Sequence, residues 1–170
     1  MNDGQELLYV HLPPQSPLPA LNPERCKVVL LARQPADLQW EKVVAEWVLE
    51  QQCFYFMAWG VDCSGWEWLV DFAFIKSLGE NPLTDENLIL TTSHNGESLQ
   101  EVLWYCEICA AHPIWPLHRT LILDIGGRDE REEVLAVWQR ALEDECDVPD
   151  APVKPTSFLT RAFNRMIKPA

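Results

Sequence analysis

Three residues of the types used in nucleophilic catalysis follow different predicted strands: Cys63, His94 and Asp124. Cys63 is expected at the start of a helix, where the helix dipole stabilises a thiolate and lowers the thiol pKa. His94 would then accept the thiol proton, and Asp124 or Glu97 would orient its imidazole ring. The sequence has no nucleophile-elbow motif, and helix capping already accounts for the Cys-Ser pair. The three residues therefore form the hypothesis of a thiol-dependent enzyme without fixing a reaction.

Polar and aromatic residues accompany these catalytic candidates at the ends of the predicted strands. In an open parallel sheet, ligands bind beyond the carboxyl ends of the strands. The candidate ligand-binding residues there are Trp59, Asp62, Ser64, Thr92 and Glu97. A small-molecule site at this place predicts a concave pocket in which these groups converge.

Cys106, Cys109 and His112 have a C-x-x-C-x-x-H spacing that suggests zinc. Within a helix, residues three apart can share a metal ion, whereas a residue six positions away lies on another side. A structural zinc ion needs four ligands, and the remaining candidates are remote in the sequence. Both cysteines also fall on an apolar stripe, where reduced cysteine commonly serves as a small hydrophobic residue. We therefore favour a core role and predict no metal site.

Gly126-Gly127 lies between a predicted strand and a predicted helix, as a phosphate-binding turn would. It matches neither the dinucleotide fingerprint nor the P-loop motif. The acidic residues that follow it would repel phosphate. The sequence therefore predicts no cofactor.

Five apolar segments separated by helical patterns position these candidates. The predicted strands cover residues 7–12, 27–33, 53–59, 87–92 and 119–124. The predicted helices begin at Asp37, at the Ser64/Glu67 capping box, at the Ser98/Glu101 capping box and after Gly127. Pro113 is expected to end the third helix, and the prolines after the first strand place that strand at a sheet edge. This alternation predicts an α/β fold: a three-layer sandwich with a mostly parallel, doubly wound sheet of about five strands, plus a C-terminal amphipathic helix.

Each predicted helix has one apolar stripe that we assign to the core. These residues are Trp40, Val43, Val44, Trp47 and Val48; Trp66, Leu69, Val70, Ala73 and Phe74; Leu99, Val102, Leu103, Cys106 and Cys109; and Val134, Leu135, Trp138 and Leu142. Trp68 and Glu67 are expected to face outward. An exposed tryptophan can anchor a protein contact, although one that covers the sheet edge is the alternative interpretation.

The distribution of charge separates the chain into three parts. Residues 1–143 are predicted to form a single α/β domain, residues 144–156 an acidic linker with several prolines, and residues 157–168 an amphipathic basic helix. All 26 acidic residues lie before position 151, whereas residues 151–170 carry four basic residues and no acid. Arg161 and Arg165 lie off the apolar stripe of the terminal helix. This helix either docks on the acidic domain, binds a partner or lies on a membrane surface.

The formal net charge of −13 favours a basic protein partner and argues against nucleic-acid binding through the acidic domain. The N-terminal segment lacks the basic and apolar regions of a signal peptide, and no apolar run is long enough to suggest a transmembrane segment. Without a secretory signal, the six cysteines are best interpreted as reduced thiols. We therefore expect a cytoplasmic protein.

One set of motifs resembles a known group of sequences. The motifs are Met57-Ala-Trp-Gly60, Asp62-Cys63-Ser64 with Trp66, Thr91-Thr92-Ser-His94, Trp104 and His112-Pro113. Over roughly residues 25–140, the chain resembles an uncharacterised bacterial family of domains of unknown function. Similar sequences are expected to carry an acidic or Trp-Asp-Asp-like stretch after the Cys-Ser pair, where this chain has Trp66-Glu67-Trp68. The resemblance thus implies a fold and a bacterial source but no activity, and this departure weakens the argument for a catalytic carboxylate at that place.

Two functions from different classes are compatible with these observations. The first is a non-catalytic, acidic protein-interaction protein of the bacterial cytoplasm, immunity-like or adaptor-like, whose partner contacts include Trp68, Arg161 and Arg165. The second is a small-molecule-binding domain or thiol-dependent enzyme with its site at the carboxyl ends of the strands. We favour the first, because the sequence lacks the phosphate-binding, metal-binding and nucleophile motifs that would support the second.

Overall fold

The computed structural model describes residues 4–143, which form five strands and four helices. The strands are β1 (Glu6–His11), β2 (Cys26–Ala32), β3 (Cys53–Gly60), β4 (Leu90–His94) and β5 (Arg119–Ile125). The helices are α1 (Leu38–Glu50), α2 (Cys63–Leu78), α3 (Leu99–Ile108) and α4 (Arg131–Glu143). The predicted linker 144–156 and helix 157–168, with Arg161 and Arg165, lie outside the described residues.

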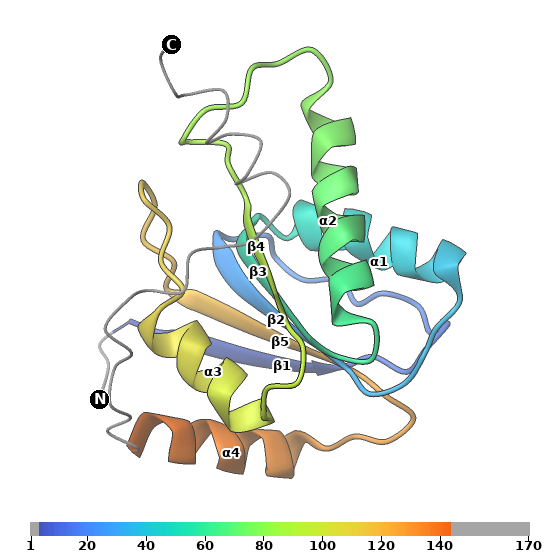
Figure 1. Ribbon diagram of the computed structural model, residues 1–170, viewed down its shortest axis with the longest axis vertical. Helices are drawn as coiled ribbons and strands as arrows, with labels where there is room; N and C mark the ends of the chain where they lie inside the picture. The colour runs from blue at the N-terminus through green and yellow to red at the C-terminus, as the bar shows by residue number, and fades with distance from the viewer. Residues whose placement is uncertain (1–3, 144–170) are drawn as a thin grey trace.

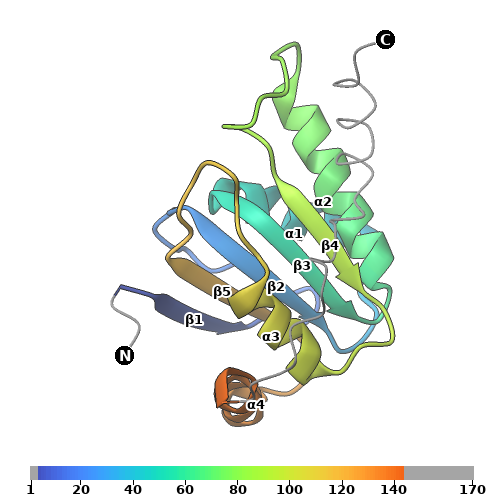
Figure 2. The ribbon, with the colours of Figure 1, turned by 60° about the vertical axis from the view of Figure 1, so that its left-hand side comes forward.

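All five strands are parallel and form one sheet in the order β1-β5-β2-β3-β4. Helices α1 and α2 cover one face of the sheet, and α3 and α4 cover the other (Figures 1 and 2). The predicted three-layer, doubly wound α/β architecture is therefore confirmed. None of the helices in residues 4–143 is long and apolar enough to span a membrane.

The central strands supply the core because they are covered on both faces. All seven residues of β2 are buried, and alternate residues contribute to opposite sides of the sheet. Val28 and Leu30 pack with α1 and α2, whereas Val29 and Leu31 pack with α3 and α4. The continuous apolar run in the sequence thus fills two separate hydrophobic clusters.

The proline-rich segment after β1 packs beside α1. Its carbonyl groups accept hydrogen bonds from two indole groups of that helix: Trp40 Nε1 donates to Ser16 O at 3.0 Å, and Trp47 Nε1 donates to Pro19 O at 3.2 Å. Strand β1 pairs only with β5 in the sheet order, which confirms its predicted place at an edge. The segment therefore connects β1 to β2 without a helix.

Two of the three predicted helix caps are confirmed. The Asp37 side chain accepts hydrogen bonds from Gln39 N and Trp40 N, and Ser98 and Glu101 form the expected capping box. The Ser64/Glu67 capping box is wrong, because α2 begins at Cys63, two residues earlier than a helix capped by Ser64 would. Its N-cap is Asp62, which has a left-handed backbone and makes no side-chain cap hydrogen bond.

The other corrections concern the ends of elements and the edges of helix stripes. Strand β4 starts at Leu90, because Asn87 closes a turn in which its side-chain oxygen accepts from Thr84 N at 2.8 Å. Helix α3 ends at Ile108, well before Pro113. Val43 and Leu142 were assigned to the core but are about half exposed, because each lies at the margin of its helix stripe.

Candidate functional site

Asp124, at the carboxyl end of β5, is fully buried and bound on both sides by its neighbours. The Arg33 guanidinium donates to its two carboxylate oxygens at 3.0 and 3.2 Å, and the Tyr9 hydroxyl donates to Oδ2 at 2.8 Å. Burial and the adjoining Asp124 carboxylate raise the pKa of Tyr9 above its ordinary value. The same Arg33 also forms an ion pair with Glu130 at 3.0 Å. Asp124 is therefore the centre of an ion-pair network that joins β1, β2, β5 and the start of α4.

His94 is a second buried polar group at the same end of the sheet. Its Nδ1 lies 2.8 Å from Glu97 Oε2 and its Nε2 lies 3.0 Å from Thr92 Oγ1, so both ring nitrogens have partners. The imidazole ring packs edge-on against Tyr105, with the two ring centroids 4.9 Å apart. The ring is thus held in place by Glu97, Thr92 and Tyr105.

The structure brings His94 to Glu97, one of the two predicted orienting residues, and the Cys63 thiol to the His94 backbone, but Asp124 lies apart from both. Asp124 and His94 lie in one row across the sheet, on β5 and β4, which are separated by β2 and β3. Three strand spacings of about 4.8 Å place their backbones about 14 Å apart. Cys63 packs in the cluster on the α1 and α2 face, whereas the His94 ring lies against α3 on the opposite face.

The environment of Cys63 is also unlike that of a reactive thiol. The residue is buried, and burial raises the pKa of its thiol, while hydrogen bonds at this turn offset the rise only in part. The expected lowering of this pKa by the helix N-terminus is therefore wrong in direction. Desolvation of the charged thiolate outweighs the helix dipole at this position.

Three of the candidate ligand-binding residues, Trp59, Thr92 and Glu97, belong to one hydrogen-bonded network that passes through His94. Trp59 Nε1 donates to Glu97 O at 2.8 Å, and Ser64 Oγ lies 3.5 Å from Ser93 Oγ. Thr92 is bonded to His94, and Asp62 is exposed in the turn before α2. These groups fix the loops after β3 and β4 to one another.

The residues of the C-x-x-C-x-x-H spacing point in different directions. Cys106 is buried in the core, and its carbonyl accepts a hydrogen bond at 2.8 Å from the buried Lys27 ammonium group. His112 Nε2 donates to Leu88 O at 2.9 Å. Within residues 4–143, no three histidine, cysteine or acidic side chains are arranged to hold a metal ion.

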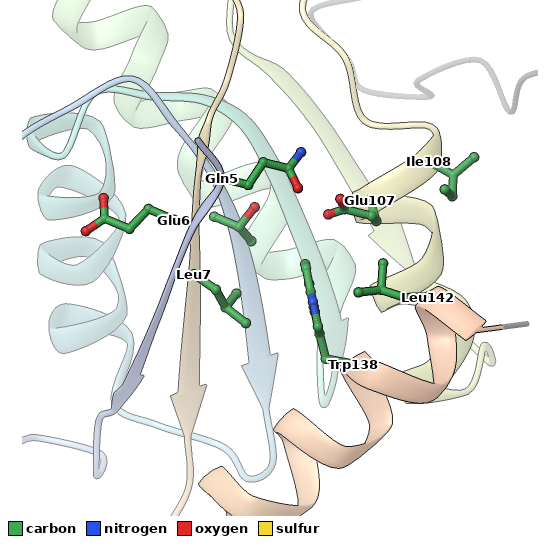
Figure 3. A pocket seen from close by; sticks show the side chains of 8 residues that line it. Gln5, Glu6, Leu7, Glu107, Ile108, Trp138 and Leu142 are labelled. Atoms are coloured by element: carbon green, nitrogen blue, oxygen red, sulfur yellow. The ribbon is translucent and has the colours of Figure 1, made fainter. Parts of the chain in front are cut away.

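An open hollow of about 800 Å³ lies at the amino ends of the strands, beside the starts of β1 and β5. It is lined by Gln5, Glu6, Leu7, Glu107, Ile108, Thr120, Trp138 and Leu142. Figure 3 shows Leu7 and Trp138 on facing sides of it, with Glu6 turned to the other side of β1. Glu6 is occupied by an ion pair with Arg119, so Glu107 is the principal acidic group of the hollow. Figure 3 shows the polar ends of Gln5 and Glu107 turned toward one another at one end of the hollow.

Helix α2 presents a row of apolar side chains to solvent: Trp68, Phe72 and Ile75, which we call the α2 row. Their exposed fractions are 58%, 53% and 42%. The Trp68 and Phe72 rings are stacked, with centroids 5.3 Å apart and an angle of 10° between the planes. Spacings of four and three residues place all three on one side of the helix. The prediction that Trp68 faces outward is therefore confirmed.

The inner side of the same helix is also apolar, because Trp66, Leu69 and Val70 are buried. A helix that is apolar on all sides normally has both sides covered. Helix α2 lies next to the edge strand β4 and packs against α1 (Figures 1 and 2). The α2 row thus lies on the outer side of a helix at one end of the molecule.

Acidic groups surround the α2 row in the sequence. Residues 59–98 contain seven acidic residues and one basic residue, Lys76, which forms an ion pair with Glu46 at 2.9 Å. Asp71 is buried beneath the row and accepts a hydrogen bond from Thr91 Oγ1 at 2.7 Å. Burial raises the pKa of Asp71 to about 7, and the nearby Glu67 contributes to the rise. The surroundings of the row are therefore unfavourable for further negative charge.

Sequence reasoning missed two members of the α2 row, Phe72 and Ile75. The signal was present in the spacing Trp68, Phe72, Ile75, but the stronger inner stripe had already explained why the helix is apolar. It also missed the buried Asp71, which lies in the sequence between the buried Val70 and the exposed Phe72. A buried carboxylate is not visible in sequence unless its partner on another element is known.

An all-parallel, five-stranded sheet with two helices on each face defines a doubly wound α/β domain. More particularly, residues 7–141 match a family described as a domain of unknown function, DUF7684, and the chain belongs to that family. This confirms the expectation of an uncharacterised domain family. No curated protein and no solved structure matches the chain.

Proposed function

We propose that this chain is a non-catalytic interaction protein of the bacterial cytoplasm, adaptor-like or immunity-like, that binds a basic and partly apolar protein surface through the α2 row. The observation that carries the proposal is the stacked, half-exposed pair of Trp68 and Phe72, extended along the helix by Ile75. The five cysteines in the described part of the chain are free thiols, which suits a reducing compartment.

Exposed aromatic side chains of this kind are typical anchors of protein interfaces. Tryptophan and other large rings bury much area on binding and lose little conformational freedom, so a few of them supply most of the binding free energy. Stacking against Phe72 further limits the motion of Trp68 in the free protein. The α2 row is therefore preorganised for contact.

The negative charge of the chain indicates that the partner surface is positively charged. The acidic residues around α2 and the net charge of −13 attract basic groups and repel acidic ones. Apolar contacts at the centre and opposite charges at the rim are the usual arrangement of a specific interface. A helix with one apolar stripe and basic residues beside it has this chemistry.

The carboxyl ends of the strands offer less support for a catalytic function. Their buried ionisable groups, Asp124 and His94, are each bound by neighbouring side chains. Cys63 is buried and its pKa is raised. A polar network whose members satisfy one another stabilises the fold and leaves few groups to act on a substrate.

The proposal is tested with a fluorescein-labelled, helix-forming peptide of leucine and lysine, amphipathic and basic, titrated with the full chain by fluorescence anisotropy. We expect binding that weakens at least about tenfold in the double variant Trp68→Ser/Phe72→Ser. The matched control Ile108→Ser/Leu142→Ser removes two equally exposed apolar side chains from α3 and α4 and should leave binding unchanged.

A peptide with the same leucines but with glutamate in place of lysine tests the sign of the charge. We expect it to bind at least about tenfold more weakly at low salt than the basic peptide. Equal binding of both peptides, or equal loss in the control variant, would show that the α2 row is not a specific site for a basic partner.

A further inference from the structure

We infer that residues 157–168 of this same chain cover the α2 row in the free protein and must leave it before a partner binds. The inference has two parts. The docking of residues 157–168 on the α2 row is independent of the proposed function, whereas their competition with a partner rests on it.

The sequence of the segment matches the chemistry of the row. Its apolar residues fall on one helical stripe and are Phe158, Leu159, Ala162, Phe163, Met166 and Ile167. Arg161 and Arg165 lie beside that stripe. An apolar stripe flanked by arginines is the surface that we derived above for the partner of the acidic, aromatic α2 row.

The dimensions of the two elements also agree. Helix α2 has 16 residues and is about 24 Å long, and a helix of 12 residues is about 18 Å long. Trp68 and Ile75 are separated by seven residues, or about 10 Å along the axis. A helix formed by residues 157–168 could therefore lie along α2 and contact all three side chains of the row.

The intervening chain is long enough to reach α2. Because each helix runs back from the carboxyl end of the strand before it, α4 and α2 both end on the side of the sheet where the strands begin, but on opposite faces. The 13 residues from 144 to 156 can span about 43 Å when extended. Four strand spacings amount to about 19 Å, and the path must also cross from the α3/α4 face to the α1/α2 face, two layers of about 10 Å each, so the direct span is about 28 Å.

Charge distinguishes the segment from the residues before it. Residues 144–150 carry Asp144, Glu145, Asp147 and Asp150 and would be repelled by the acidic surroundings of α2. Residues 151–170 have a charge of +4 and would be attracted. Within the chain beyond α4, the basic segment is thus the part with complementary charge.

Amide hydrogen exchange of the full chain, read by mass spectrometry over residues 157–168, measures the docking directly. We expect protection of at least about tenfold over an unstructured peptide, and its loss in the double variant Trp68→Ser/Phe72→Ser. The control Ile108→Ser/Leu142→Ser should keep the protection. Exchange is followed at two protein concentrations about tenfold apart, and the protection should be the same at both.

Three results would overturn the docking: no protection in the unaltered chain, loss of protection in the control variant alone, or protection only at the higher concentration. The second result would place the segment in the hollow between α3 and α4. The third would place it on a second copy of the chain.

The competition is measured with the basic leucine-lysine peptide and the variant Phe163→Glu, which leaves the α2 row intact. Release of the segment should tighten peptide binding at least about fivefold. Unchanged affinity with normal protection in the unaltered chain would overturn the competition alone. Protection without peptide binding to either protein would overturn the proposed partner while confirming the docking.

Discussion

The carboxyl ends of the strands and the outer side of α2 differ in whether their side chains have contact partners within the domain. The strand ends carry the residue types of an active site, but Asp124, Arg33 and His94 find partners within the domain. The α2 row carries no group that could perform chemistry, yet Trp68 and Phe72 expose more than half of their surface. The first region pairs its buried polar groups within the domain, whereas the second exposes apolar area that binding would remove from water.

If the α2 row is the binding surface, as proposed, this difference explains why residue type alone is a poor guide to it. Buried polar groups cost free energy unless they are paired, so a folded domain pairs most of them. Exposed apolar groups cost less individually, and a contiguous row of them is therefore the more informative feature. The comparison predicts that changes at the strand ends affect stability and that changes in the α2 row affect binding.

The largest effect is expected from Asp124→Ala. The substitution leaves the half-buried Arg33 guanidinium without its main partner and the Tyr9 hydroxyl without its acceptor. We expect the free energy of unfolding to fall by about 3–5 kcal/mol, as in other cases where one member of a buried ion pair is removed. Urea unfolding followed by circular dichroism measures the change.

The matched control is Glu132→Ala, which removes an exposed carboxylate from the first turn of α4. It should change stability by no more than about 0.5 kcal/mol. If Asp124→Ala were equally mild, the network at the strand ends would not be structural, and a functional role for Asp124 would regain support.

Asp71→Asn is expected to change the free energy of unfolding by a smaller amount and to raise it rather than lower it. The pKa of Asp71 is about 7 in the folded state and about 3.9 in an unfolded chain, so the folded state binds the proton more tightly. Its contribution to stability is therefore present below pH 4 and is lost as the pH rises from about 4 to 7. Asparagine keeps an oxygen that can accept from Thr91 but carries no charge.

The variant should therefore be more stable than the unaltered protein at pH 8, by about 2 kcal/mol, and similarly stable at pH 4. Thermal unfolding at both pH values, with the exposed Glu80→Gln as control, measures the difference. An equal effect at the two pH values would mean that Asp71 does not titrate in this range.

The last prediction concerns the rate at which the Cys63 thiol is chemically modified. Because burial raises the pKa of its thiol, iodoacetamide at pH 8 should alkylate it at least about tenfold more slowly than a free cysteine. Mass spectrometry of the labelled peptides measures the rate. Alkylation faster than that of free cysteine would revive the hypothesis of a thiol-dependent enzyme.

The parts of the fold that depend on local sequence could be predicted. The caps at Asp37 and Ser98 were correct because capping involves residues within one turn of the chain. The Ser64 cap was wrong because the left-handed turn at Asp62 starts the helix earlier, and the sequence allowed both starts. The apolar strands were placed well because complete burial leaves a continuous apolar run.

The contacts of the candidate site could not be predicted because they depend on strand order. Strand β5 lies between β1 and β2, and only this order brings Asp124 beside Tyr9 and Arg33. The same order separates Asp124 from His94 by two strands. A single sequence indicates that the strands are parallel, but it does not indicate which strands are neighbours.

The most direct test of the central claim is the anisotropy titration of the basic leucine-lysine peptide against Trp68→Ser/Phe72→Ser, with urea unfolding of the same protein. We expect affinity to fall at least about tenfold while the free energy of unfolding of the domain changes by less than about 1 kcal/mol. Undiminished affinity would contradict the assignment of the α2 row as the binding surface. If the loss of affinity were accompanied by a large fall in the free energy of unfolding, the row would belong to the core of the fold.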